Sequence, residues 1–230
     1  MSFFDRLFGR QPRVEQVSRI WLSEAEALEA VGVEVGQRLL DDRLIVVTSH
    51  FDDRLAEIEE MLRLVSIAFE KVEDRLEGRY ADRHVGGSNT ATVLLARSDV
   101  LVGDQSPAES RNPDRSVSVL MRERHGLEEY DKQVESFAAS IPFRTRMCFF
   151  DSLDDRLLKV FAGDWVRSVL QQMGMKPGEA IESHMVSKRI QAAQQKIAQR
   201  YQHARKSGQL FETWPSTTRT LSDLLDNNAG

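Results

Sequence analysis

Short apolar runs alternate with amphipathic segments over the first 65 residues, and this alternation restricts the fold more than any other feature. The run "VSRIWL" at 17–22 is rich in β-formers, and "LIVVT" at 44–48 is continuously apolar, as a strand buried on both faces requires. Between them, Ser23 and Glu26 have the spacing of a capping box, which predicts a helix to about Leu39. A strand, a helix and a strand in this order predict a β-α-β unit in a mostly parallel sheet.

The rest of the chain extends the same α/β pattern. An acid-rich helix is expected from Asp52, its N-cap, to Glu77, with Val65 at the end of its core stripe. Two helices parted near Gly163, with Asp164 capping the second, should follow the last strand. The expected strands are 17–22, 44–48, 92–96, 117–121 and 146–150. The expected sheet core is Leu44–Val47, Val93–Leu95 and Val117–Leu120.

Composition excludes several classes of protein. The net charge of −5 argues against a general nucleic-acid binder, which carries a basic excess. Cys148 is the single cysteine, so no disulfide within the chain and no cysteine metal site are expected. No two of the five histidines have the i, i+4 spacing of a helical metal site, so no metal is expected. Without a secretory signal or an apolar run of about 18 residues, the expected location is cytoplasmic.

The two ends of the chain differ from its middle. Phe3, Phe4, Leu7 and Phe8 share one face of a short amphipathic segment over residues 1–12. That face could contact a membrane surface weakly, at the inner side of the membrane, or it could pack on the domain or fray. The segment 209–230 is polar and expected to be flexible.

A basic helix is predicted at 184–208, after the "PGEAIE" turn, as one continuous segment from Met185 to Ser207. It holds no acidic residue, and its apolar seam is thin. One interpretation is a solvated helix docked along the domain edge; the other is a helix that binds a protein partner. The candidate partner-binding residues are Lys188, Arg189, Lys196, Arg200 and Arg205.

Motifs for nucleotide hydrolysis are missing from the sequence. None of the thirteen glycines precedes a lysine, whereas a phosphate-binding loop needs the Gly-Lys pair to place an ammonium group on the terminal phosphates. No serine lies in a G-x-S-x-G elbow either. No catalytic residue and no cofactor are therefore expected.

The stretch "SLDDRLLKVFAGDWVRSVLQQMGMKPGEAIESHMVSKRIQAAQQKIAQR" resembles the end of the second nucleotide-binding domain of the SecA preprotein translocase family. In addition, "SVLMRERHGLEEYDKQ" resembles that family's strand and "ERH" helix. The resemblance covers about 13–206 and is poor over 66–115. It implies a RecA-like domain over 13–183, joined to the start of a scaffold helix.

Departures from the family pattern bear on activity. Glu135, Phe137 and Ser140 stand in columns where the family carries a glycine-arginine motif that contacts ATP phosphates. An arginine finger contributes several powers of ten in rate, because it neutralises charge on the transferred phosphoryl group. Glu123, Arg124 and Gln133 match the family and would be the vestige of its nucleotide site.

The resemblance and these losses favour a non-catalytic, degenerate second nucleotide-binding domain standing alone, which acts as a binding or regulatory module linked to protein export. Its partner would be a protein, with a translocase component as the candidate, and its oligomeric state is left open. A weak nucleotide-binding sensor without hydrolysis is the main alternative. An enzyme with an unrelated site in 66–115 is the third.

Overall fold

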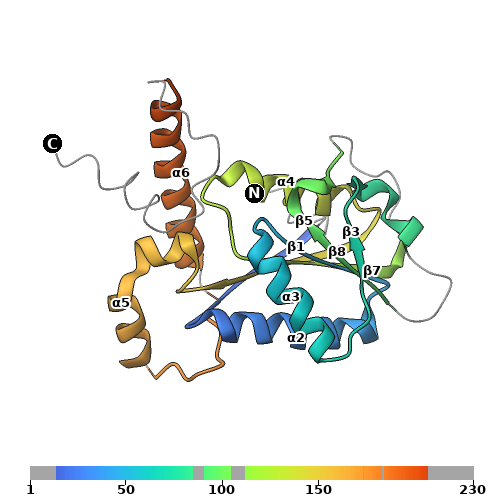
Figure 1. Ribbon diagram of the computed structural model, residues 1–230, viewed down its shortest axis with the longest axis horizontal. Coiled ribbons are helices and arrows are strands. Elements are labelled where there is room, and N and C mark those ends of the chain that lie inside the picture. Colours follow the sequence, from blue (N-terminus) through green and yellow to red (C-terminus); the bar gives the residue numbers. More distant parts are fainter. Residues whose placement is uncertain (1–13, 85–90, 105–111, 173, 183, 207–230) are drawn as a thin grey trace, which may run out of the picture.

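A six-stranded sheet organises the computed structural model, which describes residues 14–84, 91–104, 112–172, 174–182 and 184–206. Every strand pair in the sheet is parallel, and the strand order is β1-β8-β7-β2-β5-β3. The strands are β1 (Val14–Trp21), β2 (Leu44–Ser49), β3 (Glu70–Val72), β5 (Thr92–Arg97), β7 (Asn112–Arg122) and β8 (Phe143–Ser152). Helices lie on both faces (Figure 1). The expected α/β class, a parallel sheet flanked by helices, is confirmed.

Two helices, α2 (Glu24–Asp41) and α3 (Asp52–Leu64), cover one face of the sheet (Figure 1). The capping box forms as predicted: the side chain of Ser23 accepts from the backbone of Glu26, and the Glu26 carboxylate accepts in return. The core on this face joins alternate residues of the strands to the inner stripes of both helices. It includes Val31, Val35, Ile45, Val47, Ile58, Leu62, Leu120 and Phe150.

The opposite face is covered by α4 (Glu128–Ser140) and by a small parallel pair, β4 (Leu76–Glu77) and β6 (Leu101–Val102). Two 3-10 helices, η1 (Gly78–His84) and η2 (Ser98–Val100), flank the small pair. The core here includes Leu44, Val46, Leu94, Val119, Val134, Phe137, Ile141 and Phe149. All residues of the predicted sheet core are buried, because each central strand is covered on both faces.

The last two helices, α5 (Arg156–Gln172) and α6 (His184–Lys206), lie together beyond the ends of β1 and β8 (Figure 1). Their shared core includes Ile20, Leu22, Leu127, Leu157, Leu158, Ile190, Ala193 and Ile197. The predicted continuity of the basic helix is confirmed, and its apolar seam faces the domain. α6 packs mainly against α4 and α5.

Two helix predictions were wrong. α3 ends at Leu64 rather than Glu77, Val65 is 52% exposed, and Ser66 has a positive φ of 57°. The chain turns there because residues 70–72 pair with β5 as the edge strand β3. The N-cap of α3 is Phe51, and Asp52 lies within its first turn. α5 runs unbroken through Gly163 and Asp164, so no second helix begins there; one mid-helix glycine costs only about 1 kcal/mol, which packing can offset.

Two glycines offer a matched test of this packing. A Cβ at Gly103 would lie 2.2 Å from Ser136 Oγ and 2.5 Å from its backbone carbon, whereas nothing lies within 4 Å of a Cβ at Gly36. We expect Gly103→Ala to lower the free energy of unfolding by about 1–3 kcal/mol through overpacking. Gly36→Ala, in the exposed middle of α2, should raise it by about 0.5–1 kcal/mol. Urea denaturation measures both, and equal effects would contradict the packing of β6 on α4.

Candidate functional site

The carboxyl ends of β2 and β7 form the place where a parallel sheet of this kind would hold a ligand. β2 and β7 are neighbours, yet the chain leaves β2 toward α3 on one face and β7 toward α4 on the other. Ligands of open α/β sheets bind in the crevice that such a divergence creates. In this protein the crevice is occupied by the protein's own charged side chains.

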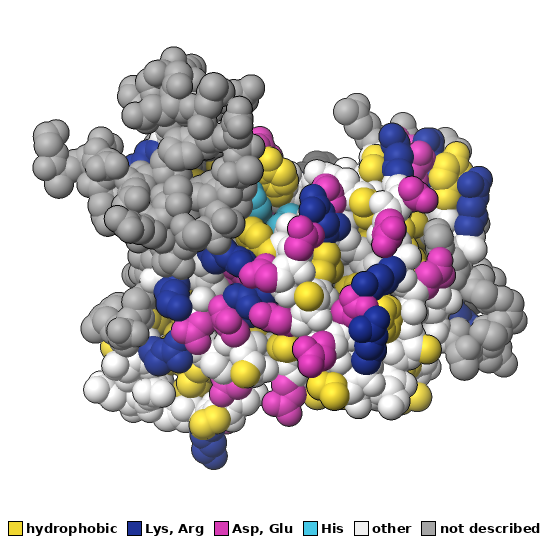
Figure 2. All heavy atoms as spheres, in the orientation of Figure 1, with side chains coloured by type: hydrophobic (Ala, Val, Ile, Leu, Met, Phe, Trp, Pro, Cys, Tyr) yellow, Lys and Arg dark blue, Asp and Glu magenta, His cyan; other side chains and the backbone are white. Residues whose placement is uncertain are grey.

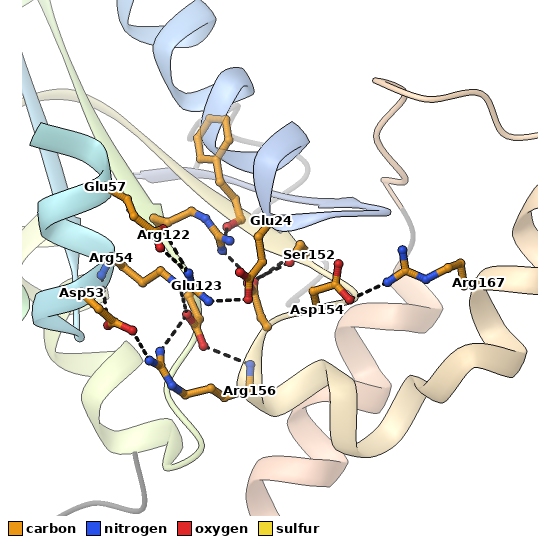
Figure 3. Close-up of polar contacts among 12 residues, drawn as sticks. Glu24, Asp53, Arg54, Glu57, Arg122, Glu123, Ser152, Asp154, Arg156 and Arg167 are labelled. Atoms are coloured by element: carbon orange, nitrogen blue, oxygen red, sulfur yellow. Dashed lines mark hydrogen bonds and ion pairs between the residues drawn. The ribbon is translucent and has the colours of Figure 1, made fainter. Parts of the chain in front are cut away.

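Glu123 is the centre of the first cluster. It follows β7, is fully buried and has a positive φ of 65°, which is unusual for a residue with a side chain. Its carboxylate accepts from Arg54 Nε at 2.6 Å, Arg156 Nη1 at 3.1 Å and the Arg156 backbone N–H at 3.0 Å (Figure 3). Burial alone would lower the pKa of Arg54, but its bond to Glu123 outweighs that effect and raises the pKa. Burial and the nearby Asp155 raise the pKa of Glu123, and its contacts with Arg54 and Arg156 oppose that rise.

The outer members of this cluster extend it to three helices. Arg54 also binds Glu24 of α2 and, at 2.9 Å, Glu57 of α3, while Arg156 binds Asp53 (Figure 3). Since Arg156 is the first residue of α5, the network joins the beginnings of α2, α3 and α5 to the end of β7.

A neighbouring pair fixes the chain where β8 passes into α5. Arg122 is 1% exposed and donates from Nη1 to Asp155 at 2.8 Å and to the carbonyl of Phe150 at 3.1 Å. Asp155 accepts in addition from the backbone N–H and hydroxyl of Ser152, at 2.6 and 2.8 Å. The Nε and Nη2 atoms of Arg122 find no hydrogen-bond partner within the described part of the chain.

Asp131 of α4 is the centre of a second buried cluster. Its Oδ1 accepts from the His125 backbone N–H at 3.0 Å and lies 2.9 Å from His50 Nε2; its Oδ2 accepts from Gln194 of α6 at 2.8 Å. Gln194 also donates to the carbonyl of His125 at 2.7 Å. Burial lowers the pKa of His125 to about 3, so its ring is neutral and Nδ1 accepts from the Leu127 backbone N–H. α6 is thus attached through a buried polar contact as well as its apolar seam.

Arg124 and Asp151 form the third pair. Arg124 donates to Asp151 at 3.0 Å and to Ser18 of β1 at 3.2 Å, and its guanidinium lies 3.5 Å from the Phe149 ring centroid. Burial raises the pKa of Asp151 to about 7, because Arg124 offsets the desolvation only partly and the nearby Asp155 and Asp131 add like charge.

The structure brings Glu123 and Arg124 of the predicted nucleotide vestige together, but it places Gln133 elsewhere. Gln133 lies on α4 and donates to the carbonyls of Ser98 and Leu101, at 3.4 and 3.1 Å. All three residues are engaged by groups of their own domain. His50, Asp131 and Gln194 were not predicted as members of the crevice. His50 directly follows β2, and a polar residue at the end of a buried strand could have indicated its place there.

The two residues that stand where the family has its arginines, Phe137 and Ser140, point into the domain. Phe137 is fully buried in the core under β4 and β6, and Ser140, 1% exposed, donates to the carbonyl of Phe137 at 2.8 Å. Glu135 is half-buried at the edge of α4, where its carboxylate accepts from Gln16 at 3.0 Å, and burial raises its pKa.

The predicted partner-binding and membrane residues are only partly placed. Lys188 and Lys196 are exposed on α6 and Arg200 is half-buried; the side chains of Arg189 and Arg205 lie outside the described part. Phe3, Phe4, Leu7 and Phe8 lie outside the described residues altogether, as does the tail 209–230. Over the described ranges, no helix could cross a membrane and no group of three His, Cys, Asp or Glu could hold a metal.

Surface charge on the face carrying α2 and α3 is mixed. Figure 2 shows acidic and basic side chains side by side across this face rather than gathered by sign. Elsewhere on the surface, Arg97 pairs with Asp99 at 2.5 Å and Arg79 pairs with Asp104 at 3.0 Å. A nucleic-acid surface would instead gather basic residues in a patch or stripe.

Comparison with known proteins confirms the resemblance to SecA. The chain is 45% identical over 89 residues to "Protein translocase subunit SecA 1" of Rhodopirellula baltica, covering 39% of this chain and 7% of that protein. It is 25% identical over 191 residues to SecA of Phocaeicola vulgatus (80% and 17%) and 22% identical over 200 residues to SecA of Campylobacter hominis (84% and 22%). The chain therefore spans between 7% and 22% of the length of these relatives.

No family model matches the chain. Among solved structures, it is similar to the crystal structure of the C-terminal part of the Fun30 ATPase domain, with a TM-score of 0.36 and 10% identity. That similarity covers 77% of this chain and 57% of the other.

The raised pKa of Asp151 predicts a pH dependence of stability. Because its folded pKa, about 7, lies above the unfolded value near 3.9, the folded state holds the extra proton and loses stability as pH rises between the two. Relative to Asp151→Asn, the wild type should lose up to about 1.4 kcal/mol per pH unit across that window. Urea denaturation from pH 4 to 8 measures the difference. Parallel curves for the two proteins would show that Asp151 titrates normally.

Proposed function

We propose that this SecA-like domain serves protein translocation as a binding or regulatory module and does not hydrolyse nucleotide. The observation that carries the proposal is the occupied crevice at the ends of β2 and β7, where Arg54, Arg156 and Arg124 each contact a carboxyl group of the domain itself. The likeness to SecA supplies the link to translocation.

A phosphate group needs unengaged donors, and the crevice offers few. To bind there, it would have to separate Glu123 from Arg54 and Arg156 and leave a fully buried carboxylate without partners. Breaking a buried pair in this way costs about 3–5 kcal/mol. The vestigial Glu123 and Arg124 therefore support a structural role better than a nucleotide site.

The positions at which the family carries its arginines support the same conclusion. The side chain of Phe137 is enclosed by apolar neighbours, so an arginine there would be a buried, unpaired charge rather than a finger pointing at phosphate. Restoring Phe137→Arg and Ser140→Arg should yield unstable protein and no turnover.

The basic helix is the proposed partner-binding element. Its seam is buried against the domain, while Lys188 and Lys196 are exposed and have no acidic residue within the helix to pair with. We propose that this outward basic face docks on an acidic surface of a translocase component, at the cytoplasmic side of the membrane.

The first test is nucleotide binding. The chain should melt at the same temperature with and without Mg-ATP or Mg-ADP, since a ligand at 100 times its Kd would add about 2.7 kcal/mol to folded-state stability. Differential scanning fluorimetry measures the melting temperature, and a coupled phosphate assay should detect no hydrolysis. A saturable upward shift without hydrolysis would replace this proposal with the nucleotide-sensor function. Turnover abolished by a single substitution in this chain would refute it.

The second test is charge reversal on α6. Lys188→Glu with Lys196→Glu should change the free energy of unfolding by less than about 1 kcal/mol, because exposed charges contribute little to stability. The same variant should lose the partners that wild-type protein captures from native lysate, as compared by mass spectrometry. Lys71→Glu with Lys176→Glu, exposed and away from α6, is the matched control and should keep them. Equal capture of partners by both double variants would show that the basic residues of α6 do not bind a partner.

A further inference from the structure

β1 is an edge strand, and within the described part of the chain most of its outward backbone groups have no backbone partner. On its inner side it pairs with β8, and on its outer side Ile20 alone exchanges two backbone hydrogen bonds with Ile181, at 3.1 and 2.8 Å. Because both backbone groups of Ile20 point outward, those of Val14, Gln16 and Ser18 also point outward, at the strand period of two. Among the described residues, no backbone group bonds to the outer side of these three. Open edges of this kind are templates for another strand.

A polar groove of about 420 Å³ lies beside this open edge. Gln16 and Ser18 of β1 form its base together with Arg124, and α4 and α6 supply its walls. The wall residues are Glu128, Asp131, Lys132 and Glu135 of α4, with Lys188, Gln191 and Gln194 of α6. An added strand would therefore have side-chain contacts on the groove side as well as backbone contacts along β1.

Two charges in the groove, Glu135 and Lys188, form no salt bridge within the described part of the chain. Arg124 is paired with Asp151, and Lys132 is paired with Glu128 at 3.0 Å, but the half-buried Glu135 has only the neutral Gln16 as a partner among the described residues. Lys188 also lines the groove, but it is exposed, so solvent screens it more strongly than Glu135. The Glu135 carboxylate is thus the charge in the groove that should distinguish basic from acidic ligands, because it favours a Lys or Arg opposite it.

We propose that the open edge of β1 and the adjoining groove bind an extended, basic segment of another polypeptide, which adds to the sheet as a strand and places a cationic side chain against Glu135. Main-chain hydrogen bonds to Gln16 and Ser18 supply the affinity, and the groove supplies the side-chain preference, as in other complexes formed by strand addition. The inference rests on the proposed role as a binding module and names one of its surfaces. This surface shares Lys188 with the basic face of α6 proposed above, whereas Lys196 lies outside the groove.

The probe is a fluorescein-labelled peptide, TKVKVKT, titrated against the full chain by fluorescence anisotropy. We expect saturable binding below about 1 mM, and loss of binding when alternate peptide nitrogens are methylated, because methylation removes the main-chain donors. TEVEVET should bind at least about tenfold more weakly. The same loss is expected for Glu135→Gln with TKVKVKT.

Two substitutions at one position separate backbone from side chain. Gln16→Pro removes the outward N–H, which the β8 ladder does not use, so the fold should persist while binding falls at least about tenfold. Gln16→Ala keeps the N–H and should bind within a few-fold of wild type. Thermal melting of both variants verifies the fold.

Several results would overturn the inference. These are no saturable binding, equal binding of the methylated peptide, or unchanged binding by folded Gln16→Pro. Binding that appears only after deletion of residues 1–12 would make the chain's own N-terminal segment the occupant. The nucleotide assays are independent of this outcome: ATP turnover with peptide binding would refute the proposed function alone, and inert nucleotide without peptide binding would refute this inference alone.

Discussion

The contacts of the buried Glu123 carboxyl group are the interactions on which the carboxyl end of the sheet depends. This residue lies at the end of a central strand, in a backbone conformation that costs about 1 kcal/mol or more for any residue with a Cβ. Two arginines from the first turns of α3 and α5 converge on it. Removing the carboxylate would leave those two guanidinium groups buried or half-buried without their main partner. One side chain therefore links α3 and α5 to the end of the sheet, in addition to their apolar packing.

The same end of the sheet explains how a parallel α/β architecture can be stable without a bound ligand. In a parallel sheet, the side chains that follow the strands must either meet a ligand or satisfy one another. Here His50, Glu123 and Arg124 are satisfied by Asp131, Arg54, Arg156 and Asp151. The crevice is stable without a ligand because its charges are balanced internally, and this balance supports the proposed role as a binding module.

Sequence patterns predicted the elements whose structure is local. The apolar run at 44–48 and the capping box at Ser23 depend on neighbouring residues, and both were found as expected. The edge strand β3 and the pair β4–β6 depend on distant partners, and their short sequences carry no period of their own, so they were missed. The side-chain network of the crevice was not predicted for the same reason: Arg54 and Glu123 are 69 residues apart in the sequence, and only the folded sheet brings them together.

The contact between Gln194 and Asp131 has a mechanical consequence. α6 extends away from the domain, and among its described side chains the amide of Gln194 reaches the polar interior. There it binds the Asp131 carboxylate, which also contacts His50 and the backbone N–H of His125. Elements held by few contacts open locally at lower free energy than the sheet to which they are attached. A force that pulls α6 away would therefore break the hydrogen bond from Gln194 to Asp131. The hydrogen bonding at the ends of β2 and β7 would then change while the sheet remained intact.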